Sequence, residues 1–223
     1  MWLKRMKILG IETSGKVASA CILDDEKIVS EITLNTKLVH SVMLIDLIDM
    51  ALKNASIDIS DIDLFAASIG PGSFTGLRIG VSTIKGFCFA LNKPCIGVNT
   101  LEALCYNFYS SSDFLMPILD AKSQKVFAGV FRFEDGELVT YEETSIYEVD
   151  RAKKMAEKYN PILLGEGLDV YDFSSFKLAP TFLQYQKASN VAIVAKKLAE
   201  KGKLLSHFEL VPLYLKKSYA EGK

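Results

Sequence analysis

The sequence has very few of the side chains that build a metal centre. It contains two histidines, His40 and His207, among 223 residues, and neither has a second histidine or a cysteine at the spacing of zinc ligands. Its four cysteines form no C-x-x-C pair, and each lies in an apolar stretch. We therefore expect buried, reduced thiols and no metal site, which removes the usual parts of a metallohydrolase. The cysteines are Cys21, Cys88, Cys95 and Cys105.

The sequence also lacks an excess of charge of one sign. Its 26 Lys and Arg residues nearly balance 27 Asp and Glu residues, which gives a formal net charge of −1. There is thus no overall positive field to hold a polyphosphate backbone. A stand-alone nucleic-acid binder is disfavoured, and any RNA role would need a partner.

Long hydrophobic runs are missing as well. The apolar runs are much shorter than the roughly 18–20 residues that cross a bilayer. The run 8–11 near the N-terminus stops at Glu12 and is too short for a signal-peptide core. These features predict a cytoplasmic protein without membrane contact. The chain is nevertheless 49% hydrophobic, which is more than we expect of a lone soluble domain.

The expected secondary structure forms two successive series, which suggests a duplicated fold. The first series has the order βββαβαβ of an RNase-H-like half. In it, Glu12 ends the opening strand and Lys16 opens the next; in the second series Asp120 and Lys125 repeat this arrangement with one extra residue. The expected strands are residues 7–12, 17–23, 27–34, 64–69, 95–98, 114–120, 125–133, 137–147, 161–165 and 211–215, and the expected helices are residues 37–54, 74–91, 149–159 and 188–201.

We therefore predict an α/β protein with two RNase-H-like lobes, each a mixed sheet flanked by helices. Actin, Hsp70 and the sugar kinases share this architecture (the ASKHA type). The expected N-terminal lobe, residues 1–103, holds a three-stranded meander and two helices with an interface role. The expected C-terminal lobe, residues 104–223, is shortened, and its final helix and strand are candidates to pack back on the first lobe.

This architecture makes an ATPase the first enzymatic hypothesis, because such proteins clamp ATP and a metal between two β-turns. A turn that cradles phosphate needs small residues, mainly glycine. The turn 13–16 has one glycine and the turn 121–124 has none, so the strand-end carboxylates are interpreted as residual or structural. We expect no cofactor and weak or absent binding of ATP and Mg²⁺. The residues of the alternative, a vestigial nucleotide or anion site, are Glu12, Ser14, Ser73, Thr75 and Asp120.

The segment 70–80, Gly-Pro-Gly-Ser-Phe-Thr-Gly-Leu-Arg-Ile-Gly, is the most informative stretch. It matches neither a Walker A loop nor the G-x-S-x-G elbow of serine hydrolases, so no catalytic residue is assigned. It is either a tight strand-to-helix turn, or a helix start at which Ser73 or Thr75 leaves N–H groups for an anion. Gly76 and Gly80 each cost the helix roughly 1 kcal/mol relative to alanine. Their presence implies the close approach of an internal element or of a partner chain.

The expected helix 38–52 is apolar over much more than the arc of about 100° that packs on one sheet. Met43 and Met50 suit a second packing surface, of the kind that becomes a protein–protein interface. His40 is interpreted as structural or interfacial, because no acid or nucleophile lies near it in the sequence. The predicted partner interface comprises His40, Met43, Leu47, Met50, Gly76, Gly80, Thr83 and Phe87.

Several segments together resemble the TsaB (YeaZ) family along nearly the whole chain. The sequence departs from the family at Glu12, where many members have aspartate, and it is short after Tyr147. Met6 matches the usual family start. The segments that carry the resemblance are Ile-Leu-Gly-Ile-Glu-Thr-Ser at 8–14, the helix entry at 37–41, the segment 70–80 with Val81 and Lys85-Gly86 after it, Gly-Val-Asn-Thr-Leu at 97–101, Leu-Asp-Ala at 119–121 and Val-Pro-Leu-Tyr-Leu at 211–215.

The resemblance implies a non-catalytic scaffold subunit of the bacterial complex that makes N6-threonylcarbamoyladenosine in tRNA. Its implied partners are the transferase TsaD, which pairs with the first two helices of the TsaB-type subunit, and the ATPase TsaE, which joins the pair. It also implies contact with tRNA only through the complex, and self-pairing when TsaD is absent.

Two alternatives belong to other functional classes. One is the ATPase described above, and the other is a glycoprotease-like peptidase, for which the sequence shows no catalytic set. Under the scaffold hypothesis, a bulky side chain in the helix seam should block association. Gly80→Leu is then expected to abolish TsaD binding while the monomer stays folded.

Overall fold

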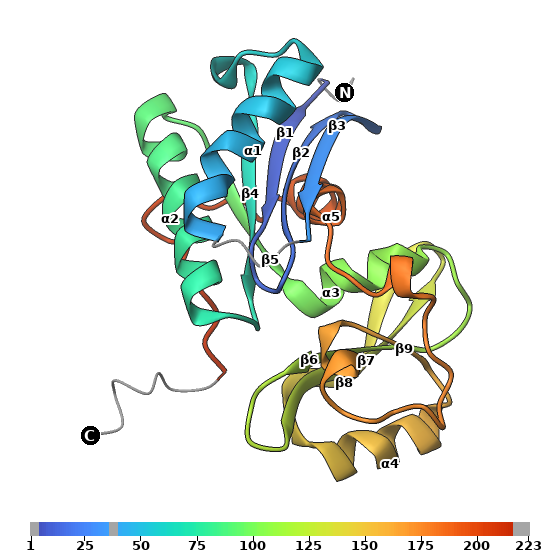
Figure 1. The fold of residues 1–223 in the computed structure, drawn as a ribbon. Helices are drawn as coiled ribbons and strands as arrows, with labels where there is room; N and C mark the ends of the chain where they lie inside the picture. The colour runs from blue at the N-terminus through green and yellow to red at the C-terminus, as the bar shows by residue number, and fades with distance from the viewer. Residues whose placement is uncertain (1–4, 36–39, 216–223) are drawn as a thin grey trace. The chain divides into compact units, whose positions relative to one another are not determined.

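Figure 1 shows the computed structural model of the chain, which describes residues 5–35 and 40–215, and of residues 40–42 the backbone alone. The chain divides into two compact units, and each has its own hydrophobic core. Unit 1 comprises Met1–Asn99 and Lys187–Leu213, and unit 2 comprises Thr100–Gln186 and Tyr214–Lys223.

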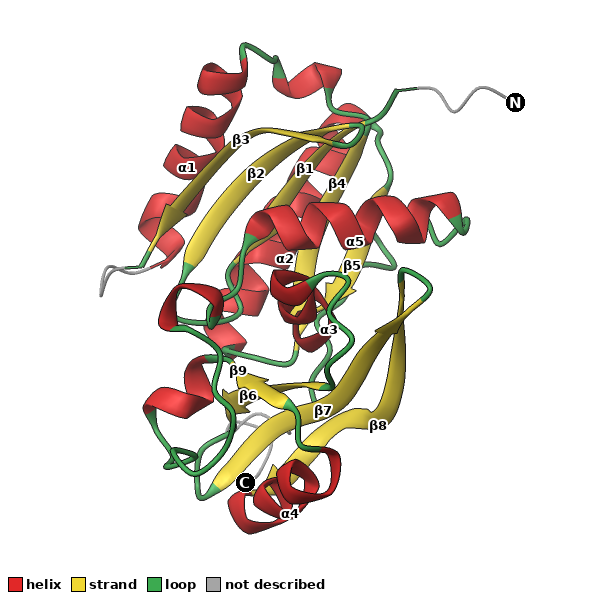
Figure 2. Cartoon of the chain, turned by 90° about the vertical axis from the view of Figure 1, so that its right-hand side faces the viewer, coloured by secondary structure: helices red, strands yellow, loops and turns green. Residues whose placement is uncertain are grey.

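Unit 1 contains a five-stranded mixed sheet with helices on both faces (Figures 1 and 2). Its elements are β1 (Lys7–Glu12), β2 (Ala18–Asp24), β3 (Lys27–Leu34), α1 (His40–Ala55), a short 3-10 helix (Ile59–Asp61), β4 (Leu64–Gly70), α2 (Phe74–Leu91), β5 (Cys95–Asn99) and α5 (Ala188–Glu200). The strand order is β3-β2-β1-β4-β5. The first three strands form an antiparallel meander, and β4 and β5 extend the sheet in parallel with β1. Parallel neighbours need crossover connections, which α1 and α2 supply.

The two faces of this sheet carry different helices. α1 and α2 lie side by side on one face, and α5 lies on the other (Figures 1 and 2). Leu9 and Ile11 of β1 belong to the core under α1 and α2. The residue between them, Gly10, faces α5: a Cβ there would lie 2.8 Å from the carbonyl oxygen of Ala188 and 2.9 Å from the Cβ of Ala192. Glycine therefore lets α5 rest directly on the sheet.

α2 is the most apolar helix of the unit. Its length and composition alone would suffice to cross a membrane. In the structure it connects the parallel strands β4 and β5 and buries six of its residues against the sheet. It begins after Ser73, whose side chain accepts a hydrogen bond from the N–H of Gly76, and it ends at Asn92 in the left-handed conformation. We conclude that α2 is a crossover helix of the sheet.

The segment 205–213 covers the outer edge of the sheet but is not a strand. Leu205 exchanges two backbone hydrogen bonds of 2.9 Å with the first residue of β5, and the N–H of Leu213 donates to a carbonyl oxygen of β4 at 2.7 Å. The prediction of a strand at residues 211–215 is therefore wrong. Pro212 has no N–H to donate, so a regular ladder cannot continue through it.

Unit 2 contains a four-stranded sheet of order β8-β7-β6-β9, which repeats the order β3-β2-β1-β4 of unit 1. β6, β7 and β8 are antiparallel neighbours, and β9 pairs with β6 in parallel. The repeat confirms the predicted α/β fold with two RNase-H-like lobes. The elements of unit 2 are α3 (Thr100–Cys105), β6 (Leu115–Asp120), β7 (Lys125–Glu134), β8 (Glu137–Glu148), α4 (Val149–Tyr159) and β9 (Ile162–Leu164), with 3-10 helices at Tyr106–Phe108, Glu166–Asp169 and Thr181–Leu183.

The helix α3 was not expected from the sequence. Its side chains Leu101 and Leu104 are fully buried in the core of unit 2. Residues 100–103, which we expected at the end of the first lobe, therefore lie in unit 2, while residues 187–213 lie in unit 1.

Side chains of the meander cap the N-terminus of α5. The N-cap residue Lys187 provides no side-chain cap. Instead, Oγ of Ser19 accepts a hydrogen bond from the N–H of Ala188, and Oε1 of Glu31 accepts one from the N–H of Ser189, both at 2.8 Å. The carboxylate also interacts favourably with the helix dipole. Polar groups near the start of the chain thus fix a helix that lies near its end.

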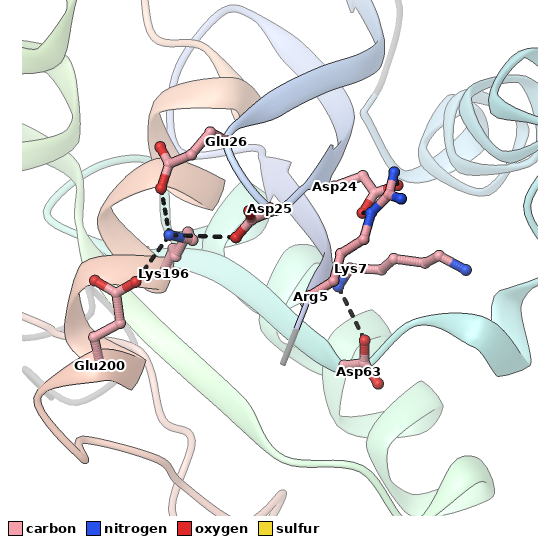
Figure 3. Close-up of polar contacts among 8 residues, drawn as sticks. All are labelled: Arg5, Lys7, Asp24, Asp25, Glu26, Asp63, Lys196 and Glu200. Atoms are coloured by element: carbon pink, nitrogen blue, oxygen red, sulfur yellow. Dashed lines mark hydrogen bonds and ion pairs between the residues drawn. The ribbon is translucent and has the colours of Figure 1, made fainter. Parts of the chain in front are cut away.

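Charged side chains fix the other end of α5 to the hairpin between β2 and β3 (Figure 3). Nζ of Lys196 lies 2.8 Å from the carboxylate of Glu200 and 3.7 Å from that of Asp25, and it also contacts Glu26. Burial lowers the pKa of Lys196, but the hydrogen bonds to Glu200 and Glu26 outweigh that effect and raise the pKa above its usual value. The neighbouring contacts in Figure 3 join Arg5 to Asp24 and the N–H of Lys7 to Asp63.

We predict that Ser19→Ala destabilises the protein, because the N–H of Ala188 then loses its acceptor in a buried place. Loss of a cap acceptor typically costs about 1 kcal/mol, and up to about 2 kcal/mol. Urea unfolding followed by circular dichroism measures the change. Ser82→Ala, at an exposed position of α2, is the matched control and should stay within about 0.5 kcal/mol of wild type. Equal stabilities of the two variants would contradict the prediction.

Candidate functional site

The turn after β1 is closed by the carboxylate of Glu12. Glu12 is fully buried, and its Oε1 accepts hydrogen bonds from both the N–H and the hydroxyl of Ser14 at 2.5 Å. Ser14 is itself buried. The strand-end carboxylate thus holds the conformation of the turn that follows it.

The glycine-rich turn between β4 and α2 packs directly on this first turn. The N–H of Ser73 donates to the carbonyl oxygen of Ser14 at 2.7 Å, and the hydroxyl of Thr13 donates to the carbonyl oxygen of Gly76 at 2.8 Å. Oγ of Ser73 accepts a hydrogen bond from the N–H of Gly76 at 3.3 Å. Unit 1 therefore brings Ser14 and Ser73 together, whereas Thr75 is exposed on the first turn of α2.

Gly76 and Gly80 are required by this contact between the two turns. A Cβ at Gly76 would overlap the carbonyl oxygen of Thr13, and a Cβ at Gly80 would overlap the hydroxyl oxygen of Thr13. Both glycines are buried inside unit 1. The prediction that they line a seam with a partner is wrong, because the element they approach is internal. Gly80→Leu would disturb unit 1 itself, so that variant cannot report on partner binding.

Two backbone groups at the start of α2 bond within unit 1. The N–H groups of Ser73 and Gly76 already have protein acceptors. A Cβ at Gly72 would overlap the carbonyl oxygen of Ser14, so this glycine rests on the first turn. The contacts form a tight strand-to-helix turn.

Asp120 ends β6 in unit 2, and neighbouring groups hold its carboxylate. Oδ1 accepts hydrogen bonds from the N–H of Lys122 at 2.7 Å and from the hydroxyl of Tyr171 at 2.9 Å, and Oδ2 forms an ion pair with the Lys122 ammonium. Burial raises the pKa of Asp120, but the hydrogen bonds from Lys122 and Tyr171 outweigh it and hold the pKa below its usual value. The carboxylate is therefore ionised and neutralised by Lys122.

The turn after Asp120 has an unusual backbone. Lys122, Ser123 and Gln124 have φ angles of 61°, 58° and 56°. The left-handed conformation costs a non-glycine residue roughly 1–2 kcal/mol. Because the hydrogen bond and ion pair from Lys122 to Asp120 both require this turn, the carboxylate offsets part of that cost. Asp120 thus has a clear structural role.

The outer face of α1 carries apolar side chains that the rest of unit 1 does not cover. Ile45 is 55% exposed and Met50 is 49% exposed, and Asp46 and Asp49 are exposed next to them in the sequence. Leu47 is only 1% exposed and packs in the core. Its assignment to a partner interface is therefore wrong.

α2 carries a second exposed strip, at whose end the Phe89 ring packs edge-on against His207 of the segment 205–213. Ser82, Gly86 and Phe89 are exposed at i, i+4 and i+7, which places them on one side of the helix. Phe89 is 73% exposed, and a Cβ at Gly86 would meet nothing within 4 Å. We use the name α1/α2 face for these exposed residues of the two helices, which are Ile45, Met50, Ser82, Gly86 and Phe89.

The other predicted interface residues differ in their surroundings. Met43, Thr83 and Phe87 are half-buried, and the Phe87 ring stacks on Phe65 with centroids 5.7 Å apart. The side chain of His40 lies outside the described residues, although its backbone begins α1.

Sequence reasoning missed Ile45, Gly86 and Phe89. The spacing of Ser82, Gly86 and Phe89 is the same as that of Gly76, Gly80 and Thr83, so periodicity could have found a second stripe but not which stripe faces outward. In the part of the chain that the structure describes, no three His, Cys, Asp or Glu side chains form a group that could hold a metal ion.

Comparison with known proteins gives consistent relatives. Residues 27–223 match the family model described as "TsaD: tRNA N6-adenosine threonylcarbamoyltransferase". The chain is 29% identical over 159 residues to the tRNA threonylcarbamoyladenosine biosynthesis protein TsaB of Bacillus subtilis, which covers 71% of this chain and 69% of that one. It is 28% identical over 210 residues to the TsaB protein of Buchnera aphidicola, with 90% and 98% covered.

The transferases themselves match a smaller part of this chain. The tRNA N6-adenosine threonylcarbamoyltransferase of Kosmotoga olearia is 35% identical over 130 residues, which are 51% of this chain and 39% of the transferase. Among solved structures, YeaZ from Pseudomonas aeruginosa superimposes with a TM-score of 0.77 at 21% identity, covering 94% of this chain and all of that one. This structural likeness shows the fold.

Two alanine substitutions in α2 should have opposite effects on stability. Gly76→Ala forces a Cβ onto the carbonyl oxygen of Thr13, and we expect a loss of about 2 kcal/mol or more. Gly86→Ala fills open space and removes a flexible residue from the helix, so it should stabilise by about 0.5–1 kcal/mol. Thermal unfolding of both variants measures the difference. If Gly76→Ala also stabilised the protein, the packing of the two turns would not be as described.

Proposed function

Because the chain belongs to the TsaD family of tRNA N6-adenosine threonylcarbamoyltransferases and, within it, to the TsaB (YeaZ) branch, we propose that it is the non-catalytic scaffold subunit of a tRNA-modifying complex. Its role lies in the biosynthesis of threonylcarbamoyladenosine in tRNA. In this proposal the chain acts in the cytoplasm and holds a transferase subunit in a competent arrangement.

The uncovered α1/α2 face carries this proposal. Ile45 and Phe89 are more than half exposed, and Met50 is 49% exposed. Exposed apolar side chains that gather on adjacent helices are typical of a protein–protein interface. Ser82 and Gly86 leave little side-chain bulk on the exposed side of α2. A partner helix could therefore approach its axis closely.

A TsaD-type transferase is the partner that we propose for this face. Such transferases align with about half of this chain, so a partner of related fold would offer a corresponding pair of helices. The two pairs would then pack in a pseudo-symmetric contact. When the transferase is absent, a second copy of this chain occupies the same face. TsaE joins the pair with ATP, and tRNA meets the chain through the complex.

We assign no nucleotide or metal to this chain within the complex. Two observations support that choice. Glu12 accepts both its close hydrogen bonds from Ser14, and Asp120 is neutralised by Lys122. The two carboxylates at which an ATPase would hold its metal thus have structural roles in their own turns.

Reconstitution of the modification tests the proposed role. The purified chain, TsaD, TsaE and the threonylcarbamoyl-AMP synthase are incubated with unmodified tRNA, and the modified nucleoside is measured by mass spectrometry after digestion. We expect product only when this chain is present together with TsaD. Full activity without this chain would overturn the scaffold role, and product formed without TsaD would overturn its non-catalytic nature.

Met50→Arg should weaken binding to TsaD while the chain stays folded. Arginine is a good helix former and sits one turn after the exposed Asp46, where opposite charges are favourable. In the complex, however, it would place a charge at an apolar contact, and we expect the dissociation constant to rise about tenfold or more.

Isothermal titration with purified TsaD measures the effect. Ile28→Arg is the matched control, since Ile28 is 44% exposed and lies on β3, outside both helices. The Ile28→Arg variant should bind TsaD with the same affinity as wild type. Unchanged binding by Met50→Arg, or equal weakening by both variants, would show that TsaD docks elsewhere.

A further inference from the structure

Three aromatic rings form a row at the C-terminal end of α2. The Phe89 ring packs edge-on against His207, with centroids 5.4 Å apart, and His207 lies against Phe208, with centroids 4.0 Å apart. Phe89 and Phe208 are 73% and 77% exposed, whereas His207 between them is half-buried. We call these three residues the aromatic row. It joins α2 to the segment 205–213.

The turn that carries Phe208 is anchored on both sides. Before the turn, Leu205 exchanges two backbone hydrogen bonds of 2.9 Å with Cys95, the first residue of β5. After the turn, Leu210 is fully buried in the core of unit 1. The residues 206–210 are therefore held at both ends, and Phe208 stands at their middle.

Hydrogen bonds within the turn hold its shape. The carboxylate of Glu209 accepts hydrogen bonds from the N–H of Ser206 at 2.9 Å and from the Ser206 hydroxyl at 2.7 Å. The carbonyl oxygen of Ser206 accepts from the N–H groups of Glu209 and Leu210 at 3.1 Å and 3.3 Å. The hydrogen bonds from Ser206 also hold the pKa of Glu209 below its usual value.

The turn thus keeps a large apolar ring ordered without burying it. An aromatic side chain that is already ordered loses little conformational entropy when a partner covers it. Aromatic side chains of this kind often carry much of the binding energy at a protein–protein interface. Phe208 therefore has the properties of an interface anchor.

The aromatic row continues the α1/α2 face, because Phe89 belongs to both. A stable protein–protein interface buries about 800 Å² and roughly 20–30 residues on each partner, which is more than the five residues of that face can supply. An interface that includes this face must extend beyond it. The contact between the Phe89 and His207 rings shows one direction in which apolar surface continues.

Aromatic rings can also stack on the bases of RNA. Binding of RNA additionally needs positive charge to hold the phosphates. The charged side chain within the turn 206–210 is the carboxylate of Glu209, which repels phosphate. The turn therefore favours a protein partner over RNA.

We propose that the aromatic row is a second part of the contact with a TsaD-type transferase, and that Phe208 is its anchor. The Phe208 ring inserts into an apolar depression of the transferase, and Phe89 packs beside it. The inference rests on the proposed function, since it assigns the same partner to a surface that lies partly outside both helices.

Isothermal titration of purified TsaD with Phe208→Ala tests the anchor. We expect the dissociation constant to rise about tenfold or more, because the ring is lost from the contact. Phe182→Ala is the matched control, since Phe182 is also 77% exposed but lies on the 3-10 helix Thr181–Leu183 of unit 2. This control should bind TsaD as wild type does. Both variants should keep the unfolding temperature of wild type, because neither ring is buried.

The outcomes separate this inference from the proposed function. If wild type binds TsaD and Phe208→Ala binds it equally well, the inference is overturned and the proposed function stands. If wild type does not bind TsaD, the proposed function itself fails. Equal weakening by Phe182→Ala would also overturn the inference. So would a Phe208→Ala variant that binds TsaD normally but whose complex binds tRNA more weakly in a gel-shift assay, because the row would then contact RNA.

A double-mutant cycle tests whether the turn positions the ring. Glu209→Ala removes the acceptor of the Ser206 N–H, and we expect the dissociation constant for TsaD to rise severalfold. In the Phe208→Ala background the same change should have no further effect, since no ring is left to position. Additive effects of the two substitutions would overturn the positioning role of Glu209.

Discussion

The contact between two turns, Thr13–Ser14 after β1 and the glycine turn that starts α2, determines how unit 1 is arranged. Backbone groups of one turn bond to backbone and side-chain groups of the other. The approach is so close that Gly76 and Gly80 have no room for a Cβ. This one constraint fixes the position of the helix start. Because a helix is rigid, it also fixes which side of α2 is turned away from the sheet. The glycines in the helix interior therefore stabilise the tertiary structure at the expense of helix propensity.

The same contact gives the glycines of this turn an internal neighbour. In a phosphate cradle the small residues face a ligand, whereas here they face the neighbouring turn. The carboxylate of Glu12 is likewise bound by the protein itself, through hydrogen bonds from Ser14 of its own turn. In unit 2 the strand-end carboxylate is also bound by its own turn, although by different residues. There Lys122 supplies both a backbone hydrogen bond and a counter-charge to Asp120. Both strand-end carboxylates thus stabilise turns.

The inner side of α2 packs on the sheet, so its outer side is the one that can bind a partner. The α1/α2 face combines exposed apolar side chains with small residues on α2, a combination suited to helix packing.

The sequence by itself determined much of the fold. Residues 7–12, 27–34, 74–91 and 149–159 form the expected elements with the expected bounds, because hydrophobic periodicity and caps are local properties. The duplicated strand order followed from Glu12 and Asp120, and the family followed from the segment 70–80. The sequence failed at α3 and at 211–215, where the outcome depends on burial of Leu101 and on which backbone groups find partners. Above all, it could not show which glycines of α2 face inward. Two stripes with the same spacing are equivalent in one dimension, and only packing against Thr13 distinguishes Gly76 and Gly80 from the exposed Gly86.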